Sequence, residues 1–177
     1  MRVLIGTTNP SKIKRFKELL HECKIEFLTL SDLNISDEPE EIGKTPEENA
    51  VIKARFYGKY CDLVICNDSE MIEYYQGLIS SLGGCVEAYY LDGIAVYNHG
   101  KVTSYMDEEL AQKTNSFYVI DKPSLKRHPG WPLDSLSVYK DSDDYFVDKK
   151  EFESKDSIIK QEYKERIVSF LKNALRI

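Results

Sequence analysis

The stretch from residue 40 to residue 70 constrains this chain of 177 residues most, because it predicts a helix that lies between two acidic clusters. Thr45 and Glu48 have the spacing of a capping box, in which each side chain satisfies a free backbone N–H group at a helix N-terminus. Pro46 suits the first helical position, since its φ is already helical and its missing N–H would have had no partner. We therefore expect a helix that begins at Pro46.

The predicted helix has a packing face and a polar flank. Apolar residues recur at spacings of three and four along one stripe, namely Ala50, Ala54, Tyr57 and Cys61. Asn49 and Lys53 lie one turn apart on the polar flank. The stripe is expected to pack, which leaves the flank available for function.

An apolar run follows the helix and predicts a buried strand. Leu63–Cys66 is too short for a helix and is typical of a strand covered on both faces. We expect the strand to end there, because four polar residues come next: Asn67, Asp68, Ser69 and Glu70. Open α/β sheets place their sites just beyond the carboxyl ends of strands. The second acidic cluster is therefore expected to meet the carboxylates that precede the helix.

The acidic residues of this stretch fit a metal site. Glu40, Glu41 and Asp68 offer oxygen ligands of the kind that Mg²⁺ prefers, usually one or two carboxylates together with substrate phosphates. Lys53 adds a cation that could meet those phosphates. A simpler interpretation is that the acidic residues complement a helix N-terminus and that Asp68 caps the next turn. Each residue alone fits the simpler interpretation, whereas their combination favours a site for metal and phosphate.

The N-terminus predicts a strand over Arg2–Gly6, a polar loop, and a helix over about Ser11–Cys23. Polar groups in and beside the loop could cradle a triphosphate at the helix N-terminus: Thr7, Thr8, Asn9, Ser11 and Lys12. The loop is not a Walker A loop, because Ser11 stands at the second glycine position and Ile13 follows the lysine. A capped turn without a ligand is an equally good interpretation of these residues alone.

The stretch resembles the signature of the inosine triphosphate pyrophosphatase family, E-x-G-x-T-x-x-E-N-A-x-x-K-A followed by D-D-S-G. The first part matches at Glu41, Gly43, Thr45, Glu48, Asn49, Ala50, Lys53 and Ala54. In the second part Asp68 and Ser69 match, while Asn67 replaces the first aspartate and Glu70 the glycine. The loop at residues 7–12 is similar to the family's T-G-N-x-x-K element, with Thr8 at the glycine position.

Two elements of the family that bind the base are altered. Gly130, Trp131 and Asp134 resemble the family's G-F-G-[WY]-D-P motif, with Pro132 and Leu133 between the tryptophan and the aspartate. The resemblance implies that Trp131 stacks on the base and that Asp134 lies near it. A tryptophan packed at a domain edge explains Trp131 equally well. The family's Ser-His-Arg triplet, which reads the 6-oxo purine edge, is missing near the start of the last helix. Arg127 and His128 are candidates to replace it.

The resemblance implies an α/β fold with a long twisted mixed sheet flanked by helices, two lobes with a central cleft, and a homodimer. It also implies Mg²⁺-dependent hydrolysis of ITP, XTP or dITP to the monophosphate and pyrophosphate. Asp68 would be the catalytic residue, and Glu41 and Asp68 the metal ligands. The substrate would be bound by Thr7, Thr8, Asn9, Lys12, Lys53, Ser69, Trp131 and Asp134. The departures at Asn67 and Glu70 leave two alternatives open: another nucleotide as substrate, or a nucleotide-binding or interaction protein with impaired catalysis.

Composition and the remaining patterns limit the other classes. A net charge of −6 with dispersed basic residues argues against a nucleic-acid coat. No apolar run reaches the ~20 residues that cross a bilayer, so we expect a cytoplasmic protein. Residues 1–177 are expected to form a single domain. Val86–Tyr97 and Val102–Tyr105 predict a hairpin, residues 117–120 a strand, and Ser154–Leu175 an amphipathic helix.

Overall fold

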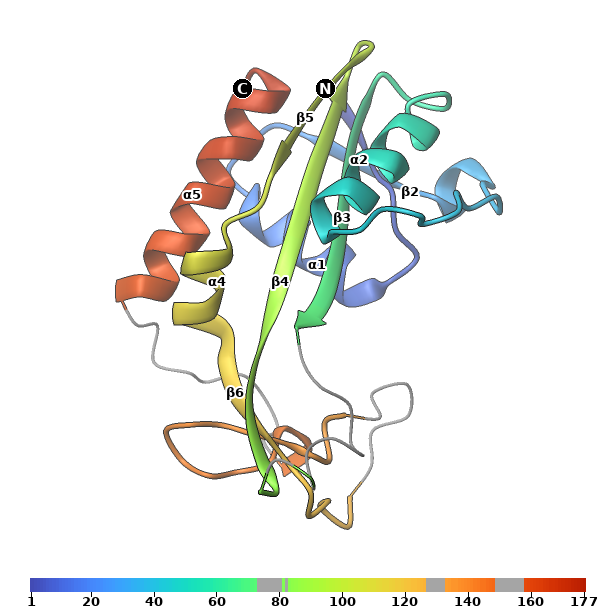
Figure 1. The fold of residues 1–177 in the computed structure, drawn as a ribbon. Helices are drawn as coiled ribbons and strands as arrows, with labels where there is room; N and C mark the ends of the chain where they lie inside the picture. The colour runs from blue at the N-terminus through green and yellow to red at the C-terminus, as the bar shows by residue number, and fades with distance from the viewer. Residues whose placement is uncertain (73–80, 82, 127–132, 149–157) are drawn as a thin grey trace. The chain divides into compact units, whose positions relative to one another are not determined.

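The computed structural model describes residues 1–72, 81, 83–126, 133–148 and 158–177 (Figure 1). It contains two compact units, each built from separate segments of the chain. The first unit comprises residues 1–70, 91–107 and 161–177, and the second comprises residues 71–90 and 108–160. The long strand β4 (Cys85–Asn98) contributes residues to both units.

The first unit contains a mixed sheet. Strand β1 (Arg2–Ile5) pairs in parallel with β2 (Glu26–Thr29) on one side and with β3 (Leu63–Ile72) on the other. Strand β4 follows β3 in the order, and its last five residues pair with β5 (Lys101–Tyr105) in an antiparallel hairpin. The turn of the hairpin is His99–Gly100, both with positive φ, so the predicted hairpin is confirmed.

Among the described residues, three α-helices and a short 3₁₀ helix belong wholly or mainly to the first unit: α1 (Pro10–Leu19), α2 (Pro46–Tyr57), α5 (Ile158–Leu175) and η1 (Ser31–Leu33). The prediction that a helix begins at Pro46 is confirmed. Helix α1 ends four residues before the predicted Cys23, with Leu20 as its C-cap. The described part of the predicted last helix is helical from Ile158, and residues 154–157 lie outside the described residues.

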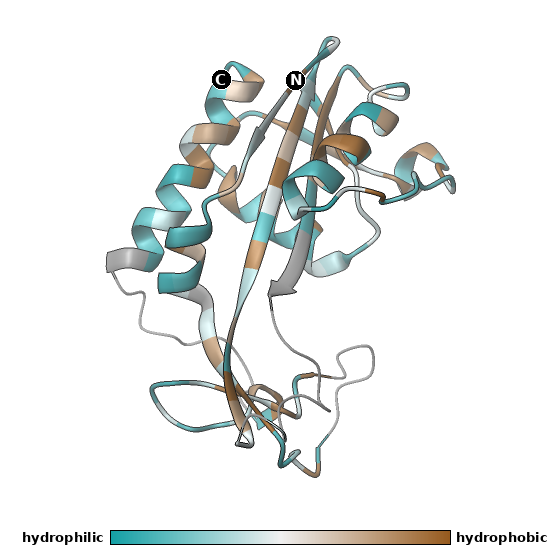
Figure 2. Ribbon diagram, viewed as in Figure 1, coloured by the Kyte–Doolittle hydropathy of each residue, from teal (hydrophilic) through white to brown (hydrophobic). Residues whose placement is uncertain are grey.

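The core of the first unit forms where α2 packs on the sheet. Ala50, Ala54 and Tyr57 are buried, as the apolar stripe predicts, against buried residues of β1, β3 and β4: Leu4, Val64, Cys66 and Ala95. Because side chains alternate along a strand, the buried neighbours Val3 and Ile5 point to the opposite face. Figure 1 shows α2 and α1 on opposite faces of these strands, and Figure 2 shows hydrophobic residues along β3 and β4.

Strand β3 is longer than the sequence predicts. We expected it to end at Cys66, but it continues through Asn67 and Asp68 to Ile72. Asn67 can remain in a buried strand because its amide nitrogen donates to Gly93 O at 3.0 Å. The polar residues that were expected beyond the strand therefore lie within it.

The second unit is built on the first part of β4. Residues Cys85–Tyr89 pair antiparallel with β6 (Ser116–Ile120), which confirms the predicted strand at residues 117–120, and β6 pairs with β7 (Ser137–Val138). The unit also contains α4 (Glu108–Asn115) and the 3₁₀ helix η2 (Phe146–Asp148). Its core is formed by Ala88, Phe117, Val119 and Leu136. Arg127, His128, Gly130 and Trp131 lie outside the described residues.

Among the described residues, no helix combines the length and the apolar composition that crossing a bilayer requires.

Candidate functional site

The N-terminus of α2 places the acidic loop beside the helix. Thr45 Oγ1 accepts from the backbone N–H of Glu48 at 3.1 Å, which is one half of the predicted capping box. The other half differs, because the Glu48 carboxylate accepts from Lys44 N at 2.6 Å. Asn49 Oδ1 accepts from Gly43 N at 2.8 Å and so ties the loop to the first turn of α2. These bonds hold the segment that carries Glu41.

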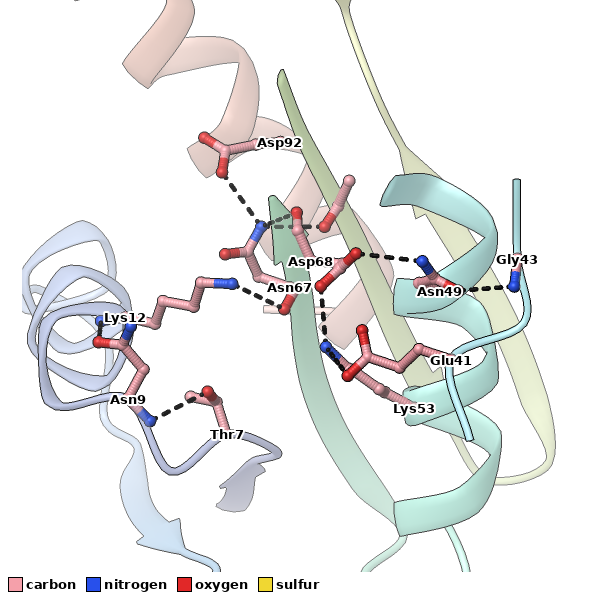
Figure 3. A network of polar contacts seen from close by, with 11 residues as sticks. Thr7, Asn9, Lys12, Glu41, Gly43, Asn49, Lys53, Asn67, Asp68 and Asp92 are labelled. Carbon is pink, nitrogen blue, oxygen red and sulfur yellow. Dashed lines mark hydrogen bonds and ion pairs between the residues drawn. The ribbon is translucent and has the colours of Figure 1, made fainter. Parts of the chain in front are cut away.

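Two carboxylates, far apart in the sequence, meet at Lys53 on the polar flank of α2 (Figure 3). The Lys53 ammonium lies 2.9 Å from Glu41 Oε1 and 2.9 Å from Asp68 Oδ1. The side chains of Lys53 and Asp68 are each 15% exposed, whereas that of Glu41 is 44% exposed. Asn49 Nδ2 donates to the other oxygen of Asp68 at 3.3 Å. The sequence prediction that these carboxylates lie together therefore agrees with the geometry.

Each charged group of this cluster stabilises the charged form of its partner. Burial acts to raise the pKa of Asp68, but the Lys53 ammonium outweighs it, with help from Asn49 and Lys12, so the pKa of Asp68 is lowered. Burial likewise acts to lower the pKa of Lys53, but its bonds to Asp68 and Glu41 raise it overall. Both groups are charged at neutral pH.

A second lysine approaches from the N-terminus of α1. Asn9 caps this helix, since its side chain accepts from the N–H groups of Ser11 at 2.9 Å and Lys12 at 3.4 Å. Lys12 then reaches β3, where its ammonium donates to the Asn67 carbonyl at 3.4 Å. Burial lowers the pKa of Lys12, while Asp68 acts in the opposite direction. Lys12 and Lys53 thus approach the same part of β3 from two helices.

The remaining residues of the predicted site lie in the loop after β1, in β3, in the second unit or outside the described residues. Thr7 Oγ1 accepts from Asn9 N at 3.2 Å, and Thr8 is exposed in the same loop. Asp134 is half-buried in the second unit. Ser69 belongs to β3, but its side chain and the whole of Trp131 lie outside the described residues. The described residues therefore bring Lys12, Glu41, Lys53 and Asp68 together, within the first unit.

The carboxylate pair suits a single divalent cation. Glu41 and Asp68 converge on one ammonium group, which is a position where two carboxylates already bind positive charge. Mg²⁺ commonly takes one or two carboxylates and completes its shell with water and substrate phosphates. In the described part of the chain there is no group of three or more His, Cys, Asp or Glu side chains arranged to hold a metal. The donors present therefore fit a metal that shares its coordination with the substrate.

Sequence reasoning missed two polar partners of this site. Asp92 of β4 and Arg15 of α1 form an ion pair at 2.8 Å, and Asp92 Oδ1 accepts from Asn67 Nδ2 at 3.3 Å. The signal was an acidic residue, Asp92, within the otherwise apolar segment Leu91–Val96 of the strand. A charged residue at such a position needs a buried partner, because desolvation otherwise disfavours it.

Comparison with known proteins gives consistent matches. The model of the Ham1 family matches residues 3–117. A dITP/XTP pyrophosphatase of Thermoanaerobacter pseudethanolicus is 38% identical over 79 residues, which cover 44% of this chain and 40% of that protein. A dITP/XTP pyrophosphatase of Bacillus subtilis is 38% identical over 82 residues, covering 46% and 38% respectively. The matched stretch thus spans about two fifths of the length of these relatives.

Solved structures match along almost the whole chain. A HAM1 protein from Coxiella burnetii gives a TM-score of 0.69 at 16% identity, covering 98% of this chain and 99% of the other. The Ham1 protein of Staphylococcus aureus gives 0.66 at 20% identity, with the same coverage. At these identities the similarity concerns the fold, and it confirms the predicted α/β class with a mixed sheet flanked by helices.

Proposed function

The chain belongs to the Ham1 family, and we propose that it is a nucleoside triphosphate pyrophosphohydrolase. Its substrates are non-standard purine nucleoside triphosphates, namely ITP, XTP and dITP, and its products are the monophosphate and pyrophosphate. One observation carries the proposal: Glu41 and Asp68, 27 positions apart in the sequence, both lie 2.9 Å from the ammonium of Lys53. Names of relatives that include dITP and XTP support the substrate class.

The reaction is attack of a water oxygen on the α-phosphorus, with cleavage of the bond between that phosphorus and the oxygen that bridges to the β-phosphorus. Pyrophosphate leaves with this bridging oxygen. Lys12 and Lys53 bind phosphate oxygens and neutralise the negative charge that develops there. Asp68 orients the attacking water and accepts its proton.

Lys53 links substrate binding to the state of Asp68. Without substrate its ammonium is shared by the two carboxylates, and this contact lowers the pKa of Asp68 and makes it a weak base. A triphosphate competes for the same ammonium. When Lys53 turns to the phosphates, its contact with Asp68 is broken, and the Asp68 carboxylate becomes available to the metal and to the attacking water.

Mg²⁺ is the metal that we propose for this site, with Glu41 and Asp68 as its protein ligands. When bound, the ion supplies positive charge that polarises the phosphate oxygens. Titration calorimetry with MgCl₂ tests this assignment without turnover. Glu41→Gln is expected to weaken Mg²⁺ binding, and unchanged affinity would exclude Glu41 as a ligand.

The activity is tested by pyrophosphate release with Mg²⁺ from ITP, XTP, dITP and the standard triphosphates. Asp68→Asn is expected to lower kcat/KM by about 10²–10⁴-fold, the range for loss of a general base. Glu26→Gln is the matched control, because it makes the same change of carboxylate to amide in an exposed pair with Arg2. Nucleotide binding without release of pyrophosphate from any substrate would instead identify a binding protein.

The remaining assignments belong to the same proposal. Thr7, Thr8, Asn9 and Ser69 bind the triphosphate, and Trp131 and Asp134 bind the base. We further propose that residues 1–177 act as one domain, that the protein is a homodimer and that it acts in the cytoplasm. Sedimentation equilibrium tests the dimer, and Trp131 fluorescence quenching by ITP tests stacking, because this is the single tryptophan of the chain.

A further inference from the structure

Asn67 is a buried amide whose surroundings require a hydrogen-bond donor. It is 1% exposed, and the two hydrogens of its Nδ2 are shared among three oxygens within hydrogen-bond distance: Asp68 O at 2.8 Å, Gly93 O at 3.0 Å and Asp92 Oδ1 at 3.3 Å. Two of these oxygens are backbone carbonyls and the third belongs to a carboxylate. A carboxylate in place of Asn67 would face them without a proton to donate, which is costly in a buried site.

The negative charge of Asp92 makes an amide at position 67 more favourable than an acid, because the carboxylate of Asp92 accepts from the amide and would repel a second carboxylate. Its two oxygens have different tasks, since Oδ1 accepts from Asn67 and Oδ2 accepts from Arg15 at 2.8 Å. Asp92 is buried and the Arg15 side chain is 31% exposed, so water screens this pair only partly. An amide at position 92 has one acceptor oxygen and could satisfy only one of the two donors.

Arg15 is itself held in place. It interacts with Tyr163 of α5 as well as with Asp92. Burial opposes the charge of Arg15, but attraction to Asp92 outweighs it, so the pKa of Arg15 is raised. A chain of polar contacts therefore runs from α5 through Arg15 and Asp92 to the strand that carries Asp68.

The contacts end on the backbone of the candidate catalytic residue. The Asn67 amide holds the carbonyl of Asp68, while the Lys12 ammonium holds the carbonyl of Asn67 (Figure 3). The Asn67 carbonyl is thus held by a side chain from α1, and the Asp68 carbonyl by the side chain of the preceding residue in the same strand. Displacement of the Asn67 side chain would release the Asp68 carbonyl and shift the carboxylate that contacts Lys53 and Asn49.

We propose that Asp92, held by Arg15, is a positioning residue that requires an amide at position 67 and, through Asn67, orients Asp68. The inference rests on the proposed function, since it assigns a role in the same reaction. The family signature alone suggests the opposite, namely that an aspartate at position 67 would restore stronger metal binding at the site.

The test is a double-mutant cycle of the full chain, Asn67→Asp, Asp92→Asn and both together, assayed for pyrophosphate release from ITP. Asn67→Asp alone is expected to lower kcat by about tenfold or more, with KM changed less than about threefold, because the effect concerns orientation and not substrate affinity. In the double variant the amide at position 92 can donate to the carboxylate at position 67. The loss caused by Asn67→Asp is therefore expected to shrink to about threefold in the Asp92→Asn background.

Two results would overturn the inference. One is a gain or no change in kcat for Asn67→Asp. The other is a double variant whose kcat is lowered by the product of the two single-variant factors, which would mean that the two positions act independently. Urea unfolding of all four proteins shows whether each variant is folded under the assay conditions. The ¹³C resonance of the Asp68 carboxyl, assigned by its absence in Asp68→Asn, reports the orientation without turnover. If wild-type protein releases no pyrophosphate, the proposed function fails, while an Asp68 resonance identical in all four proteins rejects the positioning role separately.

Discussion

Replacing Lys53 with methionine tests the charge balance of the carboxylate cluster. The substitution keeps most of the buried stem but leaves Asp68, which is 15% exposed, without its cation. A hydrogen bond to a charged partner contributes about 1.5–3 kcal/mol, and the pair with the more exposed Glu41 adds about 0–1 kcal/mol. We expect Lys53→Met to lower the free energy of unfolding by about 2–3 kcal/mol at pH 7.

The pH dependence of this loss identifies its cause. The pKa of Asp68 in the folded protein lies below its ordinary value of 3.8, so its contribution to stability is present above pH 3.8 and is lost as the pH falls through the folded pKa. The effect of Lys53→Met should therefore shrink at pH 3. Urea unfolding at both pH values measures it. Lys14→Met is the control, because Lys14 pairs with Glu18 at 3.7 Å on the exposed surface of α1.

Two results would contradict an electrostatic origin of the loss: Lys53→Met costs the same free energy of unfolding at pH 3 as at pH 7, or it costs no more than Lys14→Met at neutral pH. The first result would mean that the loss comes from packing of the lysine stem. The second would mean that the cluster is screened as well as an ordinary surface pair.

Further predictions concern the frame of the site. Thr45→Ala removes the acceptor for the N–H of Glu48 and should cost about 1 kcal/mol in urea unfolding at neutral pH. Gly93→Ala should cost about 3 kcal/mol or more in the same assay, because the added Cβ would overlap the backbone at Pro46. Since the pKa of Lys53 is raised above 10.5, its contribution is present below pH 10.5 and is lost as the pH rises through the folded pKa. On the alkaline side, the unfolding free energies of Lys53→Met and wild-type protein should therefore begin to converge only above pH 10.5.

Local features of the site were predictable because their causes lie within a few residues. Thr45 and Asn9 cap helices by bonds to N–H groups two or three positions away, and the turn at His99–Gly100 joins adjacent strands. The carboxylates near Glu41 and at Asp68 were expected to meet. The helix after Glu41 leads the chain away, and the strand that follows brings it back to Asp68. The capping and apolar patterns that predict this helix and this strand can be read in order along the chain.

Other features depended on residues that are distant in the sequence. The patterns along the chain predicted the α/β class, the start of α2 at Pro46 and the residue types available for phosphate and metal. The packing of the folded chain decided that β3 continues through Asn67 and that Lys53 bridges the two carboxylates. It also decided that Asp92, 25 positions from Asn67 and 77 from Arg15, supports the strand. A buried polar group is stabilised by whichever partner the fold brings to it, and local sequence does not specify that partner.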